Sequence, residues 1–199
     1  MLVKSIIISF FLSISLGVNA KHELPKTNVI RPWIFFDLGN TVVDTTSKKE
    51  IHYYPNTFQY LKNLKEQGYR IGIISNIPEK FGKDYNEKLA TLKKYINSKW
   101  SDDTPFDWTL FDEVIIPLND KERKPSPILF KRAMARAGRC PIVFMGENQK
   151  EVAAAKDLGL STFQVGKKGK SFYVPESGLT NFVKSTFHLD YKDNCLPPL

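Results

Sequence analysis

The sequence predicts an α/β fold, doubly wound around a mainly parallel sheet. Three observations support this prediction: short apolar runs, segments of helical pattern between them, and proline or glycine at the expected helix ends. The runs are apolar at successive positions rather than at alternate ones, which is typical of strands covered on both faces. Strand and helix patterns alternate along the chain, and this order favours parallel strands joined by right-handed crossovers.

The first half of the chain supplies two predicted strands and two predicted helices. Residues 33–36 and 71–74 are short runs of aromatic and β-branched side chains, as strands are. Between them, residues 56–67 have helical pattern, and Gly68 lies where that helix should stop. Residues 81–99 form a longer segment of helical pattern after the second strand.

The second half repeats this alternation. Residues 114–116 predict a strand, and residues 128–137 predict a helix. Ser126 is a cap residue for this helix, Pro127 suits its first position, and Gly138 lies where it should stop. The remaining elements are a strand at 142–145, a helix at 150–158 that Gly159 ends, and a strand at 162–165.

We expect a single core domain at residues 33–185, with an arm at 21–32 and a tail at 186–199. Residues 1–20 have the pattern of a secretory signal peptide, because one early lysine precedes an apolar stretch that ends in small residues. The stretch is short for crossing about 30 Å of hydrocarbon, although an uncleaved anchor is the alternative. After cleavage we expect a secreted or periplasmic protein without a stable membrane span.

The basic balance of the chain bears on its partners. The chain has 29 lysines and arginines against 21 aspartates and glutamates, a formal net charge of +8. The positive residues are scattered, as on a solvated surface, and the balance favours anionic partners such as phosphorylated ligands. No base-reading motif accompanies the charge, so we do not predict nucleic acid as a partner. The sequence predicts no oligomeric state.

Cys140 and Cys195 are the two cysteines of the chain. In an oxidising compartment they could form a disulfide that ties the tail to the loop before a strand. Two unrelated thiols are the alternative, because spacing alone does not establish disulfide geometry.

Polar side chains follow four of the predicted strands, at the edge of the sheet where ligands bind in such folds. Asp37 ends the first strand, the serine and asparagine at 75–76 follow the second, and Lys124 lies in the loop after the third. Glu147 follows the fourth strand, and Glu151 lies one helical turn further on. A carboxylate nucleophile, a hydroxyl, a cation and acidic ligands for Mg²⁺ suffice for phosphoryl transfer through an aspartyl-phosphate.

Four motifs in this order resemble the haloacid dehalogenase-like superfamily of phosphohydrolases. They are FFDLGNT, IISN, RKPSPILF and MGENQKEVAAAKDLGL, and the resemblance covers nearly all of residues 33–166. Each motif alone is weak, whereas four in the family's order, each at a predicted strand end, are specific. The resemblance implies a Rossmann-like core, and the first motif looks like the DLGN variant of a branch that includes sugar-phosphate phosphatases.

The resemblance implies a nucleophile and a metal site. Asp37 would attack phosphorus and bind Mg²⁺, and the carbonyl of Gly39 and the carboxylate of Glu147 would be further metal ligands. Glu151 would support the site from behind Glu147. The two glutamates could instead simply favour a helix N-terminus through its dipole, and Asp37 could be a turn former.

The resemblance also implies contacts with the phosphorylated substrate. Ser75 would hydrogen-bond the transferring phosphoryl group, and Lys124 would neutralise its charge. Asn76, Gly39 and Asn40 would line the substrate site. Taken alone, Ser75 and Asn76 are common turn residues, and the DKERK stretch that contains Lys124 is typical of a solvated loop.

Two residues depart from the family's pattern. Family phosphatases usually carry a second aspartate two residues after the nucleophile as the general acid, and this chain has Gly39 there. Asp44, seven residues after the nucleophile, is a candidate replacement, with a surface turn acid as the alternative. Glu147 stands where aspartate is usual, and its extra methylene moves the carboxylate outward by about 1.5 Å, which could alter affinity for Mg²⁺.

The segments that follow Thr41 and Asn76 are too short for a large cap domain, so we expect a capless member. An open site suits macromolecular phosphoesters or a lid supplied by a partner. Four aromatic residues could wall the entrance or form a satellite core beneath a loop: Trp100, Phe106, Trp108 and Phe111.

The leading hypothesis is an exported, Mg²⁺-dependent phosphohydrolase that acts on a phosphomonoester or acyl phosphate through phospho-Asp37. The alternative is a catalytically impaired relative that binds a phosphorylated or anionic ligand or a partner protein. Dehalogenase or phosphonatase chemistry is a third interpretation, because those relatives also lack the acid, but their distinguishing residues are not evident in the sequence.

Overall fold

The computed structural model describes residues 31–47, 49–166, 171–179 and 181–182. The signal peptide expected at 1–20, nearly all of the arm at 21–32 and the tail at 186–199 lie outside the described residues, and so does Cys195. Within the described part of the chain, no helix has the length and apolar character needed to cross a membrane.

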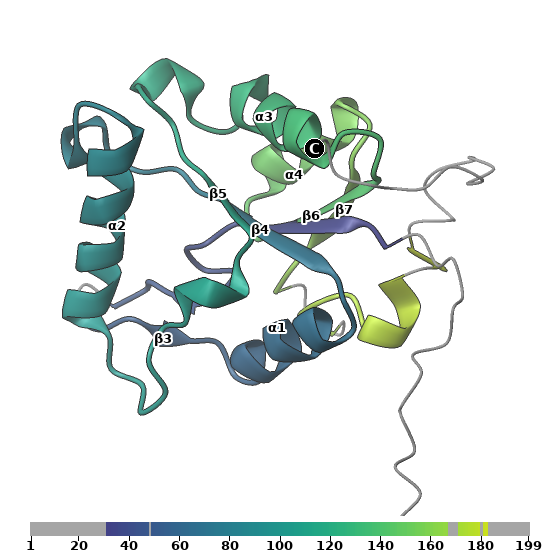
Figure 1. Ribbon diagram of the computed structural model, residues 1–199, viewed down its shortest axis with the longest axis horizontal. Helices are drawn as coiled ribbons and strands as arrows, with labels where there is room; N and C mark the ends of the chain where they lie inside the picture. Colours follow the sequence, from purple (N-terminus) through teal and green to yellow (C-terminus); the bar gives the residue numbers. More distant parts are fainter. Residues whose placement is uncertain (1–30, 48, 167–170, 180, 183–199) are drawn as a thin grey trace, which may run out of the picture.

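A five-stranded parallel sheet forms the centre of the molecule (Figure 1). Its strand order is β5-β4-β1-β6-β7, and every neighbouring pair is parallel. The predicted doubly wound α/β fold is therefore confirmed. One strand prediction matches at both ends, two differ by one residue at one end, and two are shifted by one residue as a whole. The strands are β1 (Trp33–Phe36), β4 (Arg70–Ile74), β5 (Glu113–Ile115), β6 (Ile142–Gly146) and β7 (Ser161–Gln164).

Within the described part of the chain, four α-helices connect the strands of the sheet. They are α1 (Thr57–Glu66), α2 (Tyr85–Lys99), α3 (Pro127–Ala137) and α4 (Gln149–Asp157). The helix expected at 81–99 begins later because Asp84 caps it, its side chain accepting a hydrogen bond from the backbone N–H of Glu87. The residues before this cap form a separate 3₁₀ turn, η1 (Glu79–Phe81).

The two faces of the sheet are covered by different helices, as Figure 1 shows, with α3 and α4 on one side and α1 on the other. Side chains of β1 alternate between these sides. Ile34 and Phe36 belong to the core beneath α1 and α2, whereas Trp33 and Phe35 belong to the core beneath α3 and α4. A strand that is apolar at every position can therefore be fully buried, and β1 lies in the middle of the sheet.

The segments that follow β1 and β4 contain only small elements besides β5. Between β1 and β4, the described residues form α1 and a two-stranded antiparallel ribbon of β2 (Val43–Asp44) and β3 (His52–Tyr53), here called the flap. Between β4 and Lys124 lie α2, β5 and three 3₁₀ turns: η1, η2 (Trp108–Leu110) and η3 (Asp120–Glu122). A further 3₁₀ turn, η4 (Glu176–Gly178), follows β7.

The aromatic residues after α2 form part of the core rather than an entrance wall. Phe106 and Phe111 are buried and stack with ring centroids 5.9 Å apart. Tyr53 of the flap also stacks on Phe106, Trp100 packs edge-on against it, and Trp108 packs at a tilted angle. This cluster joins the base of the flap to the core on the α1 face.

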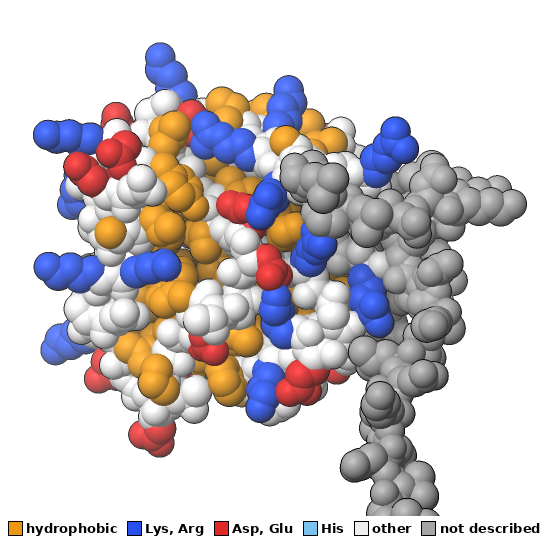
Figure 2. Space-filling model, in the orientation of Figure 1, with side chains coloured by type: hydrophobic (Ala, Val, Ile, Leu, Met, Phe, Trp, Pro, Cys, Tyr) orange, Lys and Arg blue, Asp and Glu red, His pale blue; other side chains and the backbone are white. Residues whose placement is uncertain are grey.

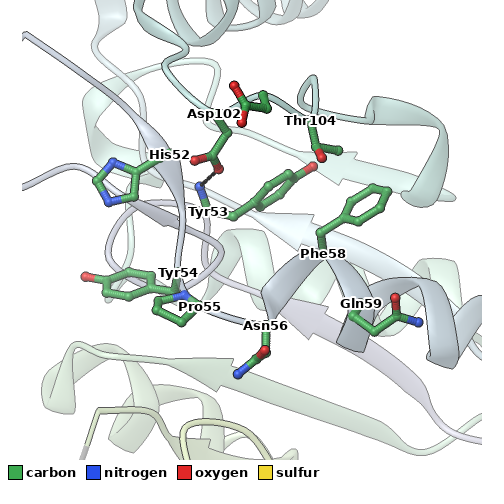
Figure 3. A pocket seen from close by; sticks show the side chains of 10 residues that line it. His52, Tyr53, Tyr54, Pro55, Asn56, Phe58, Gln59, Asp102 and Thr104 are labelled. Carbon is green, nitrogen blue, oxygen red and sulfur yellow. Dashed lines mark hydrogen bonds between the residues drawn. The ribbon is translucent and has the colours of Figure 1, made fainter.

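Charged side chains are spread over the surface as the sequence predicts. Figure 2 shows lysine and arginine side chains dispersed over this face and interspersed with acidic ones, not gathered into one basic patch. The basic balance therefore acts as a diffuse field on this face.

The close packing around Gly72 of β4 leads to a testable prediction. A Cβ at this position would lie 2.3 Å from Cε1 of Phe35, its fully buried neighbour in β1. The Gly72→Ala variant should lose about 1–3 kcal/mol of unfolding free energy in urea denaturation, because neither strand can retreat in a packed sheet. Gly178→Ala, where nothing lies within 4 Å of an added Cβ, is the matched control and should change stability by less than about 0.5 kcal/mol. Equal effects of the two substitutions would contradict the packing described here.

Candidate active site

Lys124 joins two carboxylates from distant parts of the chain. Its Nζ lies 2.8 Å from Oδ1 of Asp37, at the end of β1, and 2.7 Å from Oε2 of Glu151, in the first turn of α4. The lysine side chain is completely buried, and both carboxylate side chains are almost so. A buried ammonium is tolerated only when opposite charges compensate it, so this network fixes the lysine between the two acids.

Asn76 holds the backbone of this lysine in place. Its side-chain oxygen accepts a 2.7 Å hydrogen bond from the backbone N–H of Lys124, and its amide nitrogen donates to the Lys124 carbonyl at 2.9 Å. The same nitrogen donates to Oε1 of Glu151 at 3.1 Å. One side chain after β4 therefore ties the lysine loop to α4, and a closed ring of contacts links Asn76, Lys124 and Glu151.

Asp37 is held by its own loop as well as by the lysine. Its Oδ1 accepts a 2.7 Å hydrogen bond from the backbone N–H of Leu38, and its backbone N–H donates to the Met145 carbonyl of β6. A Cβ on Gly146 would lie 3.6 Å from Cβ of Asp37, so the glycine lets the two strand ends approach closely. Since both polar contacts use Oδ1, the other oxygen, Oδ2, remains available to a ligand.

The carboxylate of Glu147 has one buried oxygen without a hydrogen-bond partner in the protein. Its Oε2 is inaccessible to solvent and makes no hydrogen bond. Burial raises the pKa of Glu147, and the negative charges of Asp37 and Glu151 raise it further. Burial likewise raises the pKa of Glu151, although the attraction of Lys124 opposes this effect. The centre therefore holds more negative charge than Lys124 can balance.

This excess of negative charge fits a divalent cation. Three carboxylates, those of Asp37, Glu147 and Glu151, face one ammonium, and oxygen donors are the ligands that Mg²⁺ prefers. Among the described residues, no three acidic, histidine or cysteine side chains converge into a complete metal site by themselves. A metal ion at this centre would be bound by the Asp37 carboxylate together with the unpaired Oε2 of Glu147 and a backbone carbonyl next to Asp37.

Solved structures with this architecture include enzymes of one superfamily. A HAD family enzyme from Bacteroides thetaiotaomicron, in complex with magnesium and inorganic phosphate, aligns with a TM-score of 0.51 and 15% identity over 71% of this chain and 97% of that chain. A HAD-superfamily hydrolase from Ehrlichia chaffeensis aligns with a TM-score of 0.50 and 16% identity over 78% and 98% of the two chains. This chain has the haloacid dehalogenase-like (HAD) fold.

Curated relatives match part of the chain. Phosphoglycolate phosphatase of Vibrio vulnificus strain CMCP6 is 24% identical over 129 residues, which are 64% of this chain and 50% of that protein. The phosphoglycolate phosphatase of Vibrio parahaemolyticus is 22% identical over 116 residues, 56% of this chain and 43% of that protein. The chain thus spans about half the length of the curated relatives it matches. No family model matches the sequence.

Within the HAD fold, the residues predicted for the site fall into two groups. Asp37, Lys124, Glu147 and Glu151 lie within electrostatic reach of one another. Ser75 is buried at the end of β4, and its hydroxyl makes only a long 3.5 Å contact with the Asn76 carbonyl, so it can still reorient toward a ligand. Their roles toward a substrate remain predictions.

The second group, Asn76 and Asn40, makes contacts with neighbouring protein groups, and its role toward a substrate also stays a prediction. The amide of Asn76 is used by Lys124 and Glu151, which makes it a support for the lysine. Asn40, in the left-handed region at φ 52°, accepts hydrogen bonds from the N–H and hydroxyl of Thr45, and its own N–H donates to Val43. The side-chain oxygen and nitrogen of Asn76 are therefore both engaged, whereas only the side-chain oxygen of Asn40 is.

Asp44 is poorly suited to replace the missing acid. It accepts hydrogen bonds from the backbone N–H of Thr46 at 2.8 Å and from the Thr46 hydroxyl at 2.6 Å. These bonds hold the pKa of Asp44 below its usual range, whereas a proton donor at neutral pH needs a raised one. These contacts favour the alternative interpretation of Asp44 as an acid of a surface turn, and its role in proton transfer stays untested.

The expected disulfide cannot be placed within the described residues. Cys140 is buried in the loop before β6 and is not a free thiol. Cys195 lies outside the described residues, so the pairing of the two cysteines stays a prediction.

Sequence reasoning missed two features of the site. One is the aromatic ring of Phe144, over which Lys124 lies at 5.4 Å from the centroid. The other is His52, which the flap places opposite Asp44, with Nε2 and Oδ2 3.8 Å apart. The flap strands are two residues long, too short for a strand pattern to stand out in the sequence.

The loop that carries Lys124 has its own anchor, which makes a pH-dependent prediction. Glu122 accepts hydrogen bonds from the Leu118 N–H and from the Arg132 guanidinium, both Nη atoms of which lie 2.8 Å from its oxygens. The hydrogen bond from Arg132 is the largest cause that lowers the pKa of Glu122. A lowered carboxyl pKa means that the stabilisation is present above the ordinary value and is lost as the pH falls through the lowered one.

Glu122→Gln should therefore destabilise the fold by about 1–3 kcal/mol near neutral pH. The difference from the wild type should shrink below about pH 4, where the wild-type carboxylate also becomes protonated. Thermal unfolding measured across this pH range tests the expectation. Glu79→Gln, at an exposed position, serves as control, and a difference that does not depend on pH would refute the charge-assisted anchor.

Proposed function

We propose that this chain is a Mg²⁺-dependent phosphohydrolase that acts on phosphomonoesters or acyl phosphates through a phosphoaspartate at Asp37. The observation that carries the proposal is the buried network in which Lys124 contacts Asp37 and Glu151. The HAD fold and the partial similarity to phosphoglycolate phosphatases support it. The arrangement of nucleophile, cation and excess carboxylates is what phosphoryl transfer requires.

The residues that would hold Mg²⁺ are Asp37, Glu147 and the carbonyl of Gly39. When bound, the ion would supply positive charge beside the transferring phosphoryl oxygens. Support for this assignment comes from the buried Oε2 of Glu147, which has no protein partner, and from the HAD family enzyme crystallised with magnesium and phosphate.

The protein's own groups account for the first half of the reaction. Lys124 and Leu38 hold Oδ1 of Asp37, which leaves Oδ2 to attack phosphorus. Lys124 would also neutralise the phosphoryl oxygens, and Ser75 would donate a hydrogen bond to one of them. Because Asn76 fixes the lysine backbone, the ammonium needs no rearrangement when the substrate binds.

The substrate site is proposed to be open to solvent. The described segments between the strands form the flap, short turns and helices rather than a separate cap domain. A capless site accepts bulky phosphoesters, so the substrate can be macromolecular. Export to the periplasm or to the outside of the cell is proposed from the sequence of residues 1–20.

Turnover of p-nitrophenyl phosphate and acetyl phosphate tests the proposal. With about 10 mM Mg²⁺ both compounds should be hydrolysed, and Asp37→Asn should lower kcat by about 10³-fold or more, because the nucleophile is lost. Asp157→Asn, at the exposed end of α4, is a matched control that should retain full turnover. Chelation of the metal should stop turnover both in the wild type and in Asp157→Asn.

A different result would favour the alternative function. If no divalent metal supports turnover, while inorganic phosphate still binds in calorimetry and Asp37→Asn alters that binding, the chain is a ligand-binding descendant of HAD enzymes. Loss of activity in Asp157→Asn as well as in Asp37→Asn would mean that activity reports folding rather than the nucleophile.

Asn76 should affect the rate rather than substrate affinity. Asn76→Ala removes the hydrogen bonds that fix Lys124 and Glu151, so we expect kcat to fall about 10–100-fold, with a smaller change in KM. Kinetics with p-nitrophenyl phosphate measure both constants. Gln59→Ala, which truncates an amide on α1, is the control. A change confined to KM would show that Asn76 contacts the substrate instead.

A further inference from the structure

A tyrosine that is distant from the nucleophile in the sequence contacts the nucleophile's loop. The hydroxyl of Tyr173 donates a 2.6 Å hydrogen bond to the backbone carbonyl of Thr41, 132 positions earlier in the chain. Both residues are buried, so water does not readily replace this bond when it is lost. The bond therefore restrains the backbone of the loop that follows Asp37.

The loop after Asp37 is held by hydrogen bonds on both sides of Gly39. The carbonyl of Leu38 accepts bonds from two later N–H groups of the same loop, and the carbonyl of Thr41 accepts the bond from Tyr173. Among the described residues, no group donates to the carbonyl of Gly39. This carbonyl, one of the Mg²⁺ ligands proposed above, therefore lies between restrained neighbours and has no competing partner there.

The ring of Tyr173 packs against the residue that precedes the nucleophile. It meets the ring of Phe36 edge-on, with centroids 5.7 Å apart and an angle of 88° between the ring planes. Phe36 is fully buried at the end of β1 and is followed directly by Asp37. One side chain thus contacts the chain on both sides of the nucleophile, with its ring before Asp37 and with its hydroxyl after it.

The segment that carries Tyr173 is anchored on α1. Figure 1 shows η4 of this segment, drawn in yellow, beside α1. The Tyr173 ring stacks on that of Tyr60 at 4.6 Å, and the Tyr60 hydroxyl donates a 2.8 Å hydrogen bond to the Val174 carbonyl. Glu176 accepts a hydrogen bond from the side chain of Asn63. Tyr173 therefore extends from a fixed base, so its hydroxyl can restrain the loop that it contacts.

A second hydroxyl fixes the direction of the phenol. Oγ1 of Thr57, the first residue of α1, lies 2.9 Å from the Tyr173 hydroxyl. Since the single phenolic proton points to the Thr41 carbonyl, the Thr57 hydroxyl is the donor in this contact. Burial raises the pKa of Tyr173, so the phenol keeps its proton and remains a donor near neutral pH.

We propose that Tyr173 is a positioning residue of the active site, which holds the loop so that the Asp37 carboxylate and the Gly39 carbonyl are spaced for one Mg²⁺ ion. Mg²⁺ requires near-octahedral oxygens at about 2.0–2.1 Å, so a small displacement of either group weakens binding. Groups that orient metal ligands contribute about 10–100-fold to metal affinity or activity. The inference rests on the proposed function, because it concerns the metal of that same site.

Tyr173→Phe tests this role, because it keeps the ring contacts with Phe36 and Tyr60 and removes only the hydroxyl. Calorimetric titration with Mg²⁺ should show an affinity about 10-fold lower than that of the wild type. In turnover of p-nitrophenyl phosphate, the Mg²⁺ concentration that gives half the maximal rate should rise by a similar factor. KM at saturating Mg²⁺ should change by less than about twofold, because the hydroxyl contacts the loop and not the substrate.

Thr57→Val is the matched control. It removes the other hydrogen bond of the same phenol and leaves the bond to Thr41 in place, so its Mg²⁺ affinity should stay within about twofold of the wild type. Equal losses in the two variants would show that the phenol only packs the core, which would overturn the role of Tyr173. Asp37→Asn should remove most of the calorimetric signal, and a signal that persists would place the metal elsewhere and overturn the inference as well.

A second variant decides the case in which Tyr173→Phe does not fold, as judged by circular dichroism. Tyr60→Phe keeps the ring stack but removes the hydrogen bond to Val174 that anchors the segment. The looser anchor should lower Mg²⁺ affinity by about threefold, less than loss of the Tyr173 hydroxyl itself. Unchanged affinity in Tyr60→Phe would then overturn the inference.

Metal binding and turnover separate this inference from the proposed function. Unchanged Mg²⁺ affinity in folded Tyr173→Phe overturns the role of Tyr173, while turnover by the wild type still establishes the phosphohydrolase. If the wild type binds Mg²⁺ but hydrolyses neither p-nitrophenyl phosphate nor acetyl phosphate, the proposed function fails, and the calorimetric comparison still decides the role of Tyr173. If the wild type binds no Mg²⁺, both fail.

Discussion

The rest of the site depends on one buried ammonium, that of Lys124, held between the carboxylates of Asp37 and Glu151. A lysine with no solvent contact would cost several kcal/mol if either partner were lost, so the three chain segments that supply these groups must stay together. The parallel sheet makes this possible, because it brings the ends of β1 and β6 to one edge, and Asn76 then ties the end of β4 to the lysine backbone. The contacts that stabilise this part of the fold therefore also fix the geometry of the candidate site.

Most of the fold could be predicted from the sequence because its strands are short, apolar and buried on both faces. Residues 33–36 read as a strand at every position, and this prediction is confirmed without a shift. The start of α2 could not be placed, because Asp84 resembles many other polar residues, and only its hydrogen bond to Glu87 makes it a cap. The flap could not be predicted for a different reason. Strands of two residues are too short to show a periodic pattern, and their pairing depends on contacts with the nucleophile's loop.

The sequence allowed us to predict which residues at the strand ends come together, but not which hydrogen bonds they make. The rule that parallel strands present their carboxyl ends at one edge sufficed to bring Asp37, Lys124 and Glu147 together. It could not show which polar side chains are already satisfied. Asn76 has the composition of a substrate ligand, yet its side-chain oxygen and nitrogen are both engaged by the Lys124 backbone and the Glu151 carboxylate. Hydrogen-bond partners of a side chain depend on distances between loops, and no spacing in a single sequence encodes those distances.

The two departures from the family pattern have different physical consequences. Replacing an aspartate by Gly39 removes a proton donor but leaves the charge-binding part of the centre intact, so what it threatens is the rate with basic leaving groups. Glu147 acts on the charge balance instead. Its longer side chain leaves one oxygen buried without a partner, a cost of about 1–3 kcal/mol or more for a charged group. Such a cost is compensated when a cation binds there, and three carboxylates around one ammonium supply the attraction. Under the proposed function, the lysine and carboxylates of the centre would still serve a metal and a phosphoryl group, whereas Gly39 removes the usual proton donor.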